Sequence, residues 1–264
     1  MFAINKSVFL LLFFYLILNA CNSSESSDNQ TNLLSKDSLE QATEGEEFKL
    51  PKINNANVKK ILTDFGKNNP ETLVILSTKF GDIKIRLYKE TPLHRANFLQ
   101  LVKRGYYEGT VFHRVVKDLI IQGGNLDDPI IKRRKNEVGI YEIPAEFNVA
   151  QFYHKRGALA SPRRDEGNPD KKSDAYEFYI VQGTPLQAAV VQALGMQSNI
   201  TYSPAQMQMY TQVGGLPHLD GKYTVFGEVI EGLEIVDSIA SVEVDKSDDW
   251  PFQDVVISMK AVRE

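Results

Sequence analysis

The chain has almost no cysteine, and this scarcity excludes two common ways of stabilising a fold. Its 264 residues contain one cysteine, Cys21, so no disulfide can form within the chain. A zinc site built from several thiolates is excluded for the same reason. With 42% hydrophobic and 24% charged residues, the composition is that of a globular protein able to bury a sizeable core. We therefore expect one main domain held together by packing, with appendages.

A strong excess of charge of one sign is also missing. The net charge is −4, and removing residues 1–20, which hold Lys6 and no acid, makes it 29 − 34 = −5. This balance gives no electrostatic reason to expect nucleic acid as a partner. The histidines, including His113 and His218, do not stand at ligand spacing with acids, so no metal site is expected. Scattered glycines and the lack of a nucleophile elbow likewise predict no phosphate-binding loop, no serine nucleophile and no cofactor.

The longest apolar run lies near the N-terminus, at residues 8–18, and it is too short to span a bilayer as a helix. Lys6 precedes this run and a polar tract follows it at once. Both features are typical of an export signal and argue against a buried core helix. We therefore expect the protein to be exported.

The apolar run ends in LNAC at residues 18–21, which resembles the lipobox of bacterial lipoproteins. In such proteins the cysteine is lipidated and becomes the new N-terminus. Asn19 is unusual at its position, so a plain secretory signal is the alternative. The resemblance implies a lipoprotein signal peptide at residues 1–20 and lipidation of Cys21. It also implies an anchor on a bacterial membrane, facing the periplasm or the cell exterior.

Two short regions follow before the main domain. Residues 21–45 are rich in Ser, Asn, Asp, Gln and Glu, a composition that predicts a flexible tether. An arm that binds a partner is the alternative for this N-terminal segment. Residues 46–71 are expected to form a short helical lead-in, because four apolar residues recur at helical spacing and an Asn-Asn-Pro sequence then stops the pattern. These four residues are Val58, Ile61, Leu62 and Phe65.

From residue 72 onward, short runs of β-branched and aromatic residues alternate with Gly, Pro and Asp. They predict a hairpin at residues 73–87 and further strands at residues 111–116, 119–122, 158–161, 178–182, 223–229 and 255–262. One helix is expected to begin with Thr91 as N-cap and to end at Gly105, and another to begin near Leu233. Many short strands with few helices favour a closed, mainly antiparallel barrel.

Two further regions interrupt this pattern. Residues 185–214 predict a helical insertion of two helices, the second capped by Ser203 with Pro204 in its first turn. We expect this insertion to shape one side of an adjacent cleft. The basic residues 132–135 are interpreted as a solvated patch in a loop, with contact to anionic lipid head groups as the alternative.

Three blocks in the main domain carry a resemblance to a known family. They are FHRVVKDLIIQGG at residues 112–124, EFYIVQGTP at residues 177–185 and HLDGKYTVFGEVIEGLEIVD at residues 218–237. Their order and spacing resemble the cyclophilin-type peptidyl-prolyl cis-trans isomerases over about residues 72–264. The resemblance implies a mainly β fold, a closed eight-stranded antiparallel barrel capped by two helices. It also implies an enzyme that rotates X-Pro bonds without a cofactor.

The resemblance assigns roles to particular residues. Arg114 matches the catalytic arginine, and Gln122 matches the glutamine that helps to hold this arginine and the substrate backbone. The implied apolar pocket for the proline ring consists of Leu119, Ile120, Tyr179 and Leu219. The other implied substrate-binding residues are His113, Pro162, Glu177, His218 and Tyr223.

Several of these residues depart from the family pattern. Leu119 and Ile120 replace the usual phenylalanine and methionine, which keeps the pocket apolar but changes its shape. Glu177 stands where glutamine is common, and its carboxylate could pair with Arg114 or repel acidic peptides. Pro162 stands in a segment that replaces a turn of small residues. A proline-binding module or holdase that has lost turnover is therefore the alternative to an active isomerase.

The expected mechanism is noncovalent. The barrier to rotation of a peptide bond is about 18–20 kcal/mol and arises from amide resonance, so drawing the proline nitrogen out of conjugation lowers it. Arg114 is expected to donate toward this amide as the bond twists. The expected partners are proline-containing peptides or unfolded exported proteins, bound by a monomer.

Overall fold

The structure is a computed structural model, and it describes residues 51–263. The predicted signal peptide, the lipidation site Cys21 and the tether at residues 21–45 lie outside these described residues. Among the described residues, no helix has the length and apolar character needed to cross a membrane.

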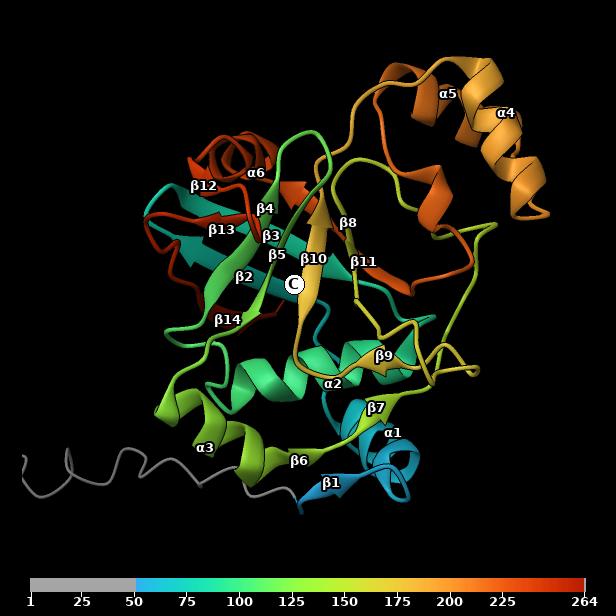
Figure 1. Ribbon diagram of the computed structural model, residues 1–264. Helices are drawn as coiled ribbons and strands as arrows, with labels where there is room; N and C mark the ends of the chain where they lie inside the picture. Colours follow the sequence, from blue (N-terminus) through green and yellow to red (C-terminus); the bar gives the residue numbers. More distant parts are fainter. Residues whose placement is uncertain (1–50, 264) are drawn as a thin grey trace, which may run out of the picture. The chain divides into compact units, whose positions relative to one another are not determined.

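Eight strands form one antiparallel sheet, in the spatial order β14-β2-β3-β11-β8-β10-β5-β4 (Figure 1). In chain order they are β2 (Leu73–Thr78), β3 (Gly81–Leu87), β4 (Val111–Val116), β5 (Ile120–Asn125), β8 (Ala158–Ala160), β10 (Phe178–Val181), β11 (Val225–Glu231) and β14 (Ser258–Val262). The hairpin and the later strands predicted from the sequence are thus present, with ends that differ by a few residues.

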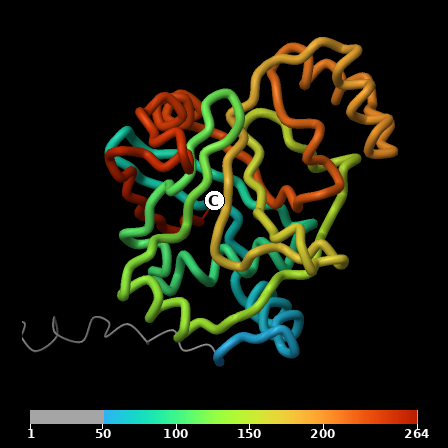
Figure 2. Tube along the Cα trace, viewed as in Figure 1, coloured from blue at the N-terminus to red at the C-terminus, as the bar shows by residue number. Residues whose placement is uncertain are grey.

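The sheet is an open half-barrel, so the prediction of a closed barrel is wrong. The outer strands β4 and β14 do not pair with each other as strands. The edge of β4 instead contacts β13 (Trp250–Pro251), and an isolated bridge joins Val111 to Val256 in the segment before β14. Figure 2 shows this C-terminal segment, in red, beside the green β4. Because β13 and the segment before β14 share this edge, β4 and β14 form no continuous ladder with each other.

Short strand pairs lie outside the main sheet. They are β1 (Ile53–Asn54) with β6 (Gly139–Ile140), β7 (Glu142–Ile143) with β9 (Ser173–Asp174), and β12 (Val244–Asp245) with β13. The pair β1 and β6 is parallel, and the other two pairs are antiparallel.

The two helices expected in the main domain are α2 (Pro92–Lys103) and α6 (Leu233–Ala240). The first contacts β11 and β14, and the second contacts β3, β4 and β5. Thr91 stands at the N-cap of α2, but its hydroxyl donates to the Tyr88 carbonyl and does not cap the helix. The carboxylate of Glu146 accepts the Leu93 and His94 amides instead. Glu146, which is distant in sequence, therefore caps α2 in place of the predicted Thr91.

Two other helices bear on the sequence predictions. The lead-in helix is α1 (Val58–Asn68), which buries Val58, Leu62 and Phe65 and packs on α2. The basic residues 132–135, interpreted as a loop, lie in α3 (Pro129–Val138). Asp128 caps this helix by accepting the Ile130 amide at 2.7 Å. An aspartate followed by a first-turn proline is a helix-start signal that the sequence interpretation missed.

The region of the expected helical insertion contains α4 (Ala188–Gln197) and α5 (Pro204–Gln212). Ser203 and Gln206 form a capping box at the start of α5, as the predicted Ser-Pro start suggests. The short 3₁₀ helix η2 (Pro217–Leu219) follows and contacts α4. We call residues 185–214 the α4–α5 arm. It lies at the upper right in Figure 1, beyond the ends of β8 and β10.

Side chains from the sheet enter two separate apolar clusters. The larger is the main core and holds Phe178 and Ile180 from β10. The smaller holds Tyr179 and Val181 from the same strand. Because neighbouring residues of a strand point to opposite faces, β10 contributes to both clusters at once. We call the smaller one the groove cluster.

Candidate functional site

The predicted catalytic arginine lies at a β-bulge. Phe112 pairs with Gly123 and Arg114 pairs with Gln122, so His113 is an extra residue on β4 with no counterpart on β5. A bulge changes the direction in which the side chains around it point, and bulges are frequent beside active sites. The sequence alone gives no signal for this bulge, because it depends on the pairing register.

Arg114 begins a row of residues that crosses the sheet. It pairs with Gln122 on β5, Gln122 pairs with Tyr179 on β10, and Tyr179 pairs with Ala160 on β8. Residues directly opposite each other on neighbouring strands present their side chains on the same face. With strands about 4.8 Å apart, the backbone of Arg114 lies about 10 Å from that of Tyr179. The long arginine side chain can therefore reach over the apolar residues of this row.

The guanidinium of Arg114 has a partner that the sequence did not predict. Its Nη2 lies 3.3 Å from Oδ2 of Asp249, and the two side chains are 41% and 35% exposed. The backbone holds Asp249 in place, because the Val115 amide donates to its carbonyl at 2.9 Å. An ion pair this exposed contributes at most about 1 kcal/mol, so Arg114 can exchange Asp249 for a bound peptide.

Glu177 does not pair with Arg114, contrary to one of the two expectations for it. Its carboxylate accepts the side-chain amides of Gln122 and Asn125, each at 2.9 Å. Nε2 of His113 lies 3.4 Å from the same carboxylate. The carboxylate is turned toward amide donors on β5 and toward the bulged histidine, whereas Arg114 is held by Asp249.

These contacts determine the charge of Glu177. Burial alone would raise its pKa, but the hydrogen bond and the charge of His113, with the hydrogen bonds from Gln122 and Asn125, outweigh burial and lower the pKa to about 2. The groove therefore carries one fixed negative charge beside the Gln122 amide at neutral pH.

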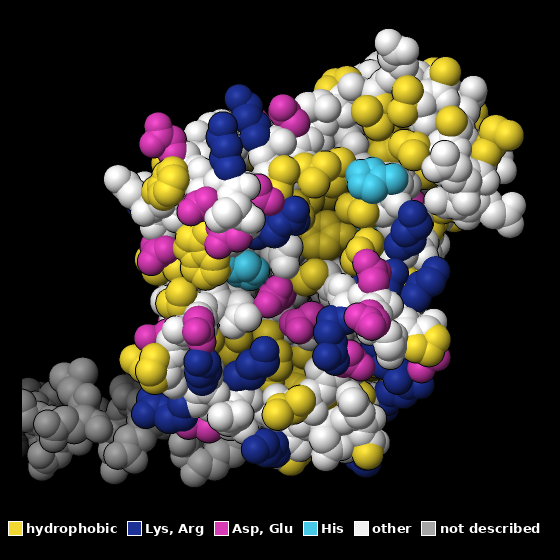
Figure 3. Space-filling view, in the orientation of Figure 1, with side chains coloured by type: hydrophobic (Ala, Val, Ile, Leu, Met, Phe, Trp, Pro, Cys, Tyr) yellow, Lys and Arg dark blue, Asp and Glu magenta, His cyan; other side chains and the backbone are white. Residues whose placement is uncertain are grey.

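The apolar residues predicted to receive a proline ring come together. Ile120 and Tyr179 are buried in the groove cluster, and half-buried Leu119, Leu219 and Tyr223 pack against it. Figure 3 shows hydrophobic side chains gathered in a hollow over β8 and β10, with charged side chains around it. The cluster is partly open to solvent, as a site for an apolar ring must be.

A buried chain of hydrogen bonds supports the floor of this cluster. Nε2 of His154 lies 2.8 Å from the Tyr179 hydroxyl, and Nδ1 of His154 lies 2.7 Å from Oδ1 of Asp220. The carboxylate of Asp220 also accepts the hydroxyls of Tyr202 and Tyr210, at 2.9 and 2.5 Å. With Nδ1 donating to the carboxylate, Nε2 accepts from Tyr179. Burial raises the pKa of Tyr179 far above its usual value, so its hydroxyl keeps its proton.

The sequence interpretation treated His154 as a structural or solvent-facing residue without a role in the site. The structure shows that it is buried and links Tyr179 to the tyrosines of the α4–α5 arm. A signal was present, since Asp220 directly follows the pocket residue Leu219 in the HLDG block. What the sequence could not show is which histidine this aspartate contacts.

The remaining predicted residues lie around the rim. Pro162 follows β8, and its carbonyl accepts the Asp174 amide at 2.8 Å. The guanidinium of Arg163 lies over the Tyr223 ring, 5.0 Å from its centroid. His218 stands on η2, where burial is the main cause that lowers its pKa. His218 therefore favours its neutral form at neutral pH.

A second histidine with a carboxylate and a hydroxyl lies inside the fold. Nδ1 of His94 is 2.7 Å from Glu146, and Nε2 is 2.9 Å from the Ser173 hydroxyl. This order resembles a hydrolytic triad, but Ser173 is only 1% exposed and no substrate can reach it. The group instead fixes the start of α2. In residues 51–263, no three His, Cys, Asp or Glu side chains converge as metal ligands would.

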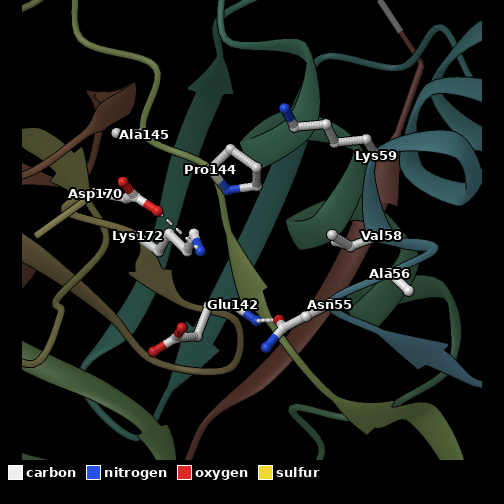
Figure 4. A pocket seen from close by; sticks show the side chains of 9 residues that line it. All are labelled: Asn55, Ala56, Val58, Lys59, Glu142, Pro144, Ala145, Asp170 and Lys172. Atoms are coloured by element: carbon white, nitrogen blue, oxygen red, sulfur yellow. Dashed lines mark hydrogen bonds and ion pairs between the residues drawn. The ribbon is translucent and has the colours of Figure 1, made fainter. Parts of the chain in front are cut away.

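A cavity of about 510 Å³ lies between the start of α1 and the segments around β7 and β9. Two of its contacts are the ion pair of Lys172 with Asp170 at 3.1 Å and the hydrogen bond from the Glu142 backbone amide to the Asn55 side chain at 2.8 Å (Figure 4). It contains none of the residues of the Arg114 row. We therefore place the functional site at the groove cluster.

Comparison with known proteins identifies the family of this chain. The family model described as cyclophilin type peptidyl-prolyl cis-trans isomerase matches residues 73–262. A Staphylococcus aureus (strain USA300) protein named as a peptidyl-prolyl cis-trans isomerase is 32% identical over 198 residues, covering 74% of this chain and 93% of that protein. A Streptococcus pyogenes protein named as a bifunctional phosphatase/peptidyl-prolyl cis-trans isomerase is 32% identical over 197 residues. That match covers 72% of this chain but only 38% of the streptococcal protein.

Solved structures show the same fold. A cyclophilin type peptidyl-prolyl cis-trans isomerase of Cryptosporidium parvum has a TM-score of 0.52 and 24% identity, covering 74% of this chain and 99% of that chain. A second structure of that protein, in the presence of the dipeptide Ala-Pro, has a TM-score of 0.51. The sequence resemblance is confirmed, and the chain belongs to the cyclophilin-type peptidyl-prolyl cis-trans isomerases.

Proposed function

We propose that this isomerase acts on X-Pro bonds of exported proteins, with Arg114 at the twisted amide. The observation that carries this proposal is the row across the sheet, which aligns Arg114 and Gln122 with the Tyr179 ring. It combines a half-exposed cation, an amide and an apolar hollow on one face. Rotation about an X-Pro bond needs no nucleophile and no metal. A cation, an amide and an apolar hollow are therefore sufficient for this reaction.

The mechanism follows from how these groups are held. A proline ring enters the groove cluster between Ile120, Tyr179 and Leu219, and the peptide lies along the groove as an extended strand. Arg114 leaves its exposed pair with Asp249 and donates toward the proline amide as the bond twists. Only a contact that is stronger in the twisted state than in either planar isomer accelerates the rotation.

The cellular role is inferred from the N-terminal sequence. Residues 1–20 and Cys21 match an export signal with a lipidation site, which would anchor the enzyme to a membrane outside the cytoplasm. Uncatalysed isomerisation takes tens to hundreds of seconds, which is slow enough to limit the folding of newly exported chains. Labelling with a radioactive fatty acid, with Cys21→Ser as the control, tests the anchor.

One observation favours a second function, a proline-binding module or holdase without useful turnover. The Gln122 side chain donates to Glu177, so one of its two N–H donors is engaged within the protein and is not offered to a substrate backbone. The negative charge of Glu177 also disfavours acidic peptides. Against this alternative stands Arg114, whose ion pair with Asp249 is weak and exchangeable.

A protease-coupled assay with a proline tetrapeptide separates the two functions. Arg114→Ala is expected to lower kcat/KM by roughly 100-fold, the usual cost of removing a donor from the transition state. Arg86→Ala is a matched control, because Arg86 is a half-exposed arginine of β3 in the same sheet, near Glu228. If the wild type and Arg114→Ala accelerate the reaction equally little while both still bind proline peptides, the holdase function is correct.

A further inference from the structure

The α4–α5 arm differs in chemistry from the rest of the protein. Residues 183–219 contain no Lys, Arg, Asp or Glu, although 24% of the whole chain is charged. Several of its apolar side chains are open to solvent, including Val190 at 42% and Met196 at 82% exposure. On the face shown in Figure 3, the arm carries hydrophobic and neutral side chains without a basic or acidic one. An exposed surface that is apolar and uncharged is typical of a site that contacts another apolar surface.

The arm contains a groove of its own. A cavity of about 300 Å³ lies between α4 and α5, lined by Gln192, Met196, Ile200, Thr201, Tyr202 and Met207. Methionine side chains are flexible and polarisable, which suits a surface that binds varied apolar partners. The walls are nevertheless firmly placed, because a Cβ at Gly195 would lie 2.7 Å from the Ile200 carbonyl oxygen. The segment after α4 therefore packs tightly against that helix.

The wall of this groove is joined to the wall of the proline pocket. Tyr202, which lines it, donates to Asp220 at 2.9 Å, and its hydroxyl oxygen lies 3.1 Å from the Pro217 carbonyl oxygen. Pro217 begins η2, which carries the pocket residue Leu219 and contacts α4. The arm therefore adjoins the element that carries Leu219, within reach of a polypeptide bound in the proline pocket.

We propose that the α4–α5 arm binds an uncharged, apolar stretch of the same polypeptide whose proline occupies the pocket. This inference rests on the proposed function and specifies the substrate class, namely unfolded chains with apolar residues near the proline. Charged segments would lose hydration on this surface and gain no ion pair, so they are disfavoured. Because the proline end is already bound, a weak contact at the arm raises the overall affinity through its high effective concentration.

Three peptides and two double variants test this inference on the chain without its signal peptide. One peptide of about 20 residues, which spans ~60 Å when extended, carries a central Ala-Pro with apolar flanks. The second carries glutamates in those flanks, and the third is a proline tetrapeptide. Met196→Glu with Met207→Glu adds charge to the groove, and Met196→Leu with Met207→Leu keeps it apolar. Ile140→Glu is the control for an exposed apolar residue elsewhere, at 75% exposure.

The wild type is expected to bind the apolar peptide, by fluorescence anisotropy, about ten-fold more tightly than the tetrapeptide or the glutamate peptide. The glutamate variant should lose most of this gain, while its kcat/KM for the tetrapeptide stays within about two-fold of the wild type. The leucine variant and Ile140→Glu should match the wild type. Circular dichroism of each variant checks that it is folded.

Several results would overturn the inference. The glutamate variant could keep the full gain, or it could lose tetrapeptide turnover to the same extent, in which case the arm only shapes the pocket. Sedimentation could show that the wild type is a dimer that Met196→Glu dissociates, which makes the arm a contact between copies. Binding could also require lipid vesicles, which makes the arm a membrane contact. If the wild type binds the apolar peptide tightly but does not turn over the tetrapeptide, the arm is supported and the isomerase mechanism fails.

Discussion

The two sides of the groove hold their polar groups in different ways. On the side of β4 and β5, Arg114 and Asp249 are partly exposed and joined by a single contact. On the side of η2, His154 and Asp220 are buried, and the carboxylate accepts four hydrogen bonds, including one from the His154 amide. Exposed groups can exchange partners with a substrate, whereas buried ones cannot. We infer that the first side acts on the peptide bond and that the second fixes the shape of the pocket.

The largest loss of stability is expected from a substitution on the buried side of the groove, at Asp220. Asp220→Ala leaves His154 and two tyrosine hydroxyls without their acceptor, so the free energy of unfolding should fall by about 3–5 kcal/mol. Urea unfolding measures this loss. If Asp220→Ala costs less than about 1 kcal/mol, the network is not what holds this side of the groove together.

Glu146→Ala is the matched control for this change, because Glu146 holds His94 in a similar group beneath α2. It should cost comparable stability. However, only Asp220→Ala should weaken the binding of proline peptides, since only that network reaches Tyr179. Equal losses of proline-peptide binding in both folded variants would contradict the inference that the η2 side fixes the shape of the pocket.

The pH dependence of stability tests the role of the Glu177 charge on the side of β4 and β5. The pKa of Glu177 is about 2 in the folded protein against a usual value of 4.5, so its charged form stabilises the fold. This contribution is fully present above about pH 4.5 and is lost as the pH falls through 2. Glu177→Gln should therefore lower the free energy of unfolding by about 2–3 kcal/mol at pH 7, and by progressively less toward pH 2.

The measurement is the difference in unfolding free energy between wild type and Glu177→Gln at a series of pH values. Glu234→Gln, at an exposed position of α6, serves as the control and should show little difference at any pH. A Glu177→Gln effect that does not change with pH would mean that the charge of Glu177 is not stabilised by its neighbours.

How much of this site the sequence could predict depends on the range of each contact. Arg114, Gln122 and the apolar residues were predicted from contiguous blocks, and the strands do bring them to one face. Asp249 and His154 were missed because each meets the site through a contact distant in sequence. The block around Leu219 contains Asp220, but it does not reveal which histidine this aspartate contacts. The prediction of a closed barrel was wrong for a related reason. Whether β4 and β14 pair depends on which segment lies along β4, and this is a long-range contact.

A smaller effect is expected at the pocket floor. Tyr179→Phe removes the hydroxyl that donates to His154 and leaves Nε2 without that partner, which should cost about 1–2 kcal/mol of unfolding free energy. The ring remains, so kcat/KM for a tetrapeptide should change by less than about three-fold, or roughly 0.6 kcal/mol. Tyr153→Phe, whose ring lies beside Tyr210, is the control. If the loss in kcat/KM, expressed as a free energy, exceeds the loss in unfolding free energy, the Tyr179 hydroxyl takes a direct part in the reaction.

The smallest effect is expected at Asp249, and it tests whether the charged side is truly exchangeable. Because the pair with Arg114 is half-exposed, Asp249→Asn should change the free energy of unfolding by less than about 1 kcal/mol. Releasing Arg114 should raise kcat/KM up to about three-fold at low ionic strength, and salt should produce the same rise in the wild type by screening the pair. Asp64→Asn, which breaks the exposed pair with Lys60 on α1, should leave turnover unchanged. A ten-fold fall in kcat/KM for Asp249→Asn would show instead that Asp249 orients the arginine, and the charged side would then be as fixed in its geometry as the buried one.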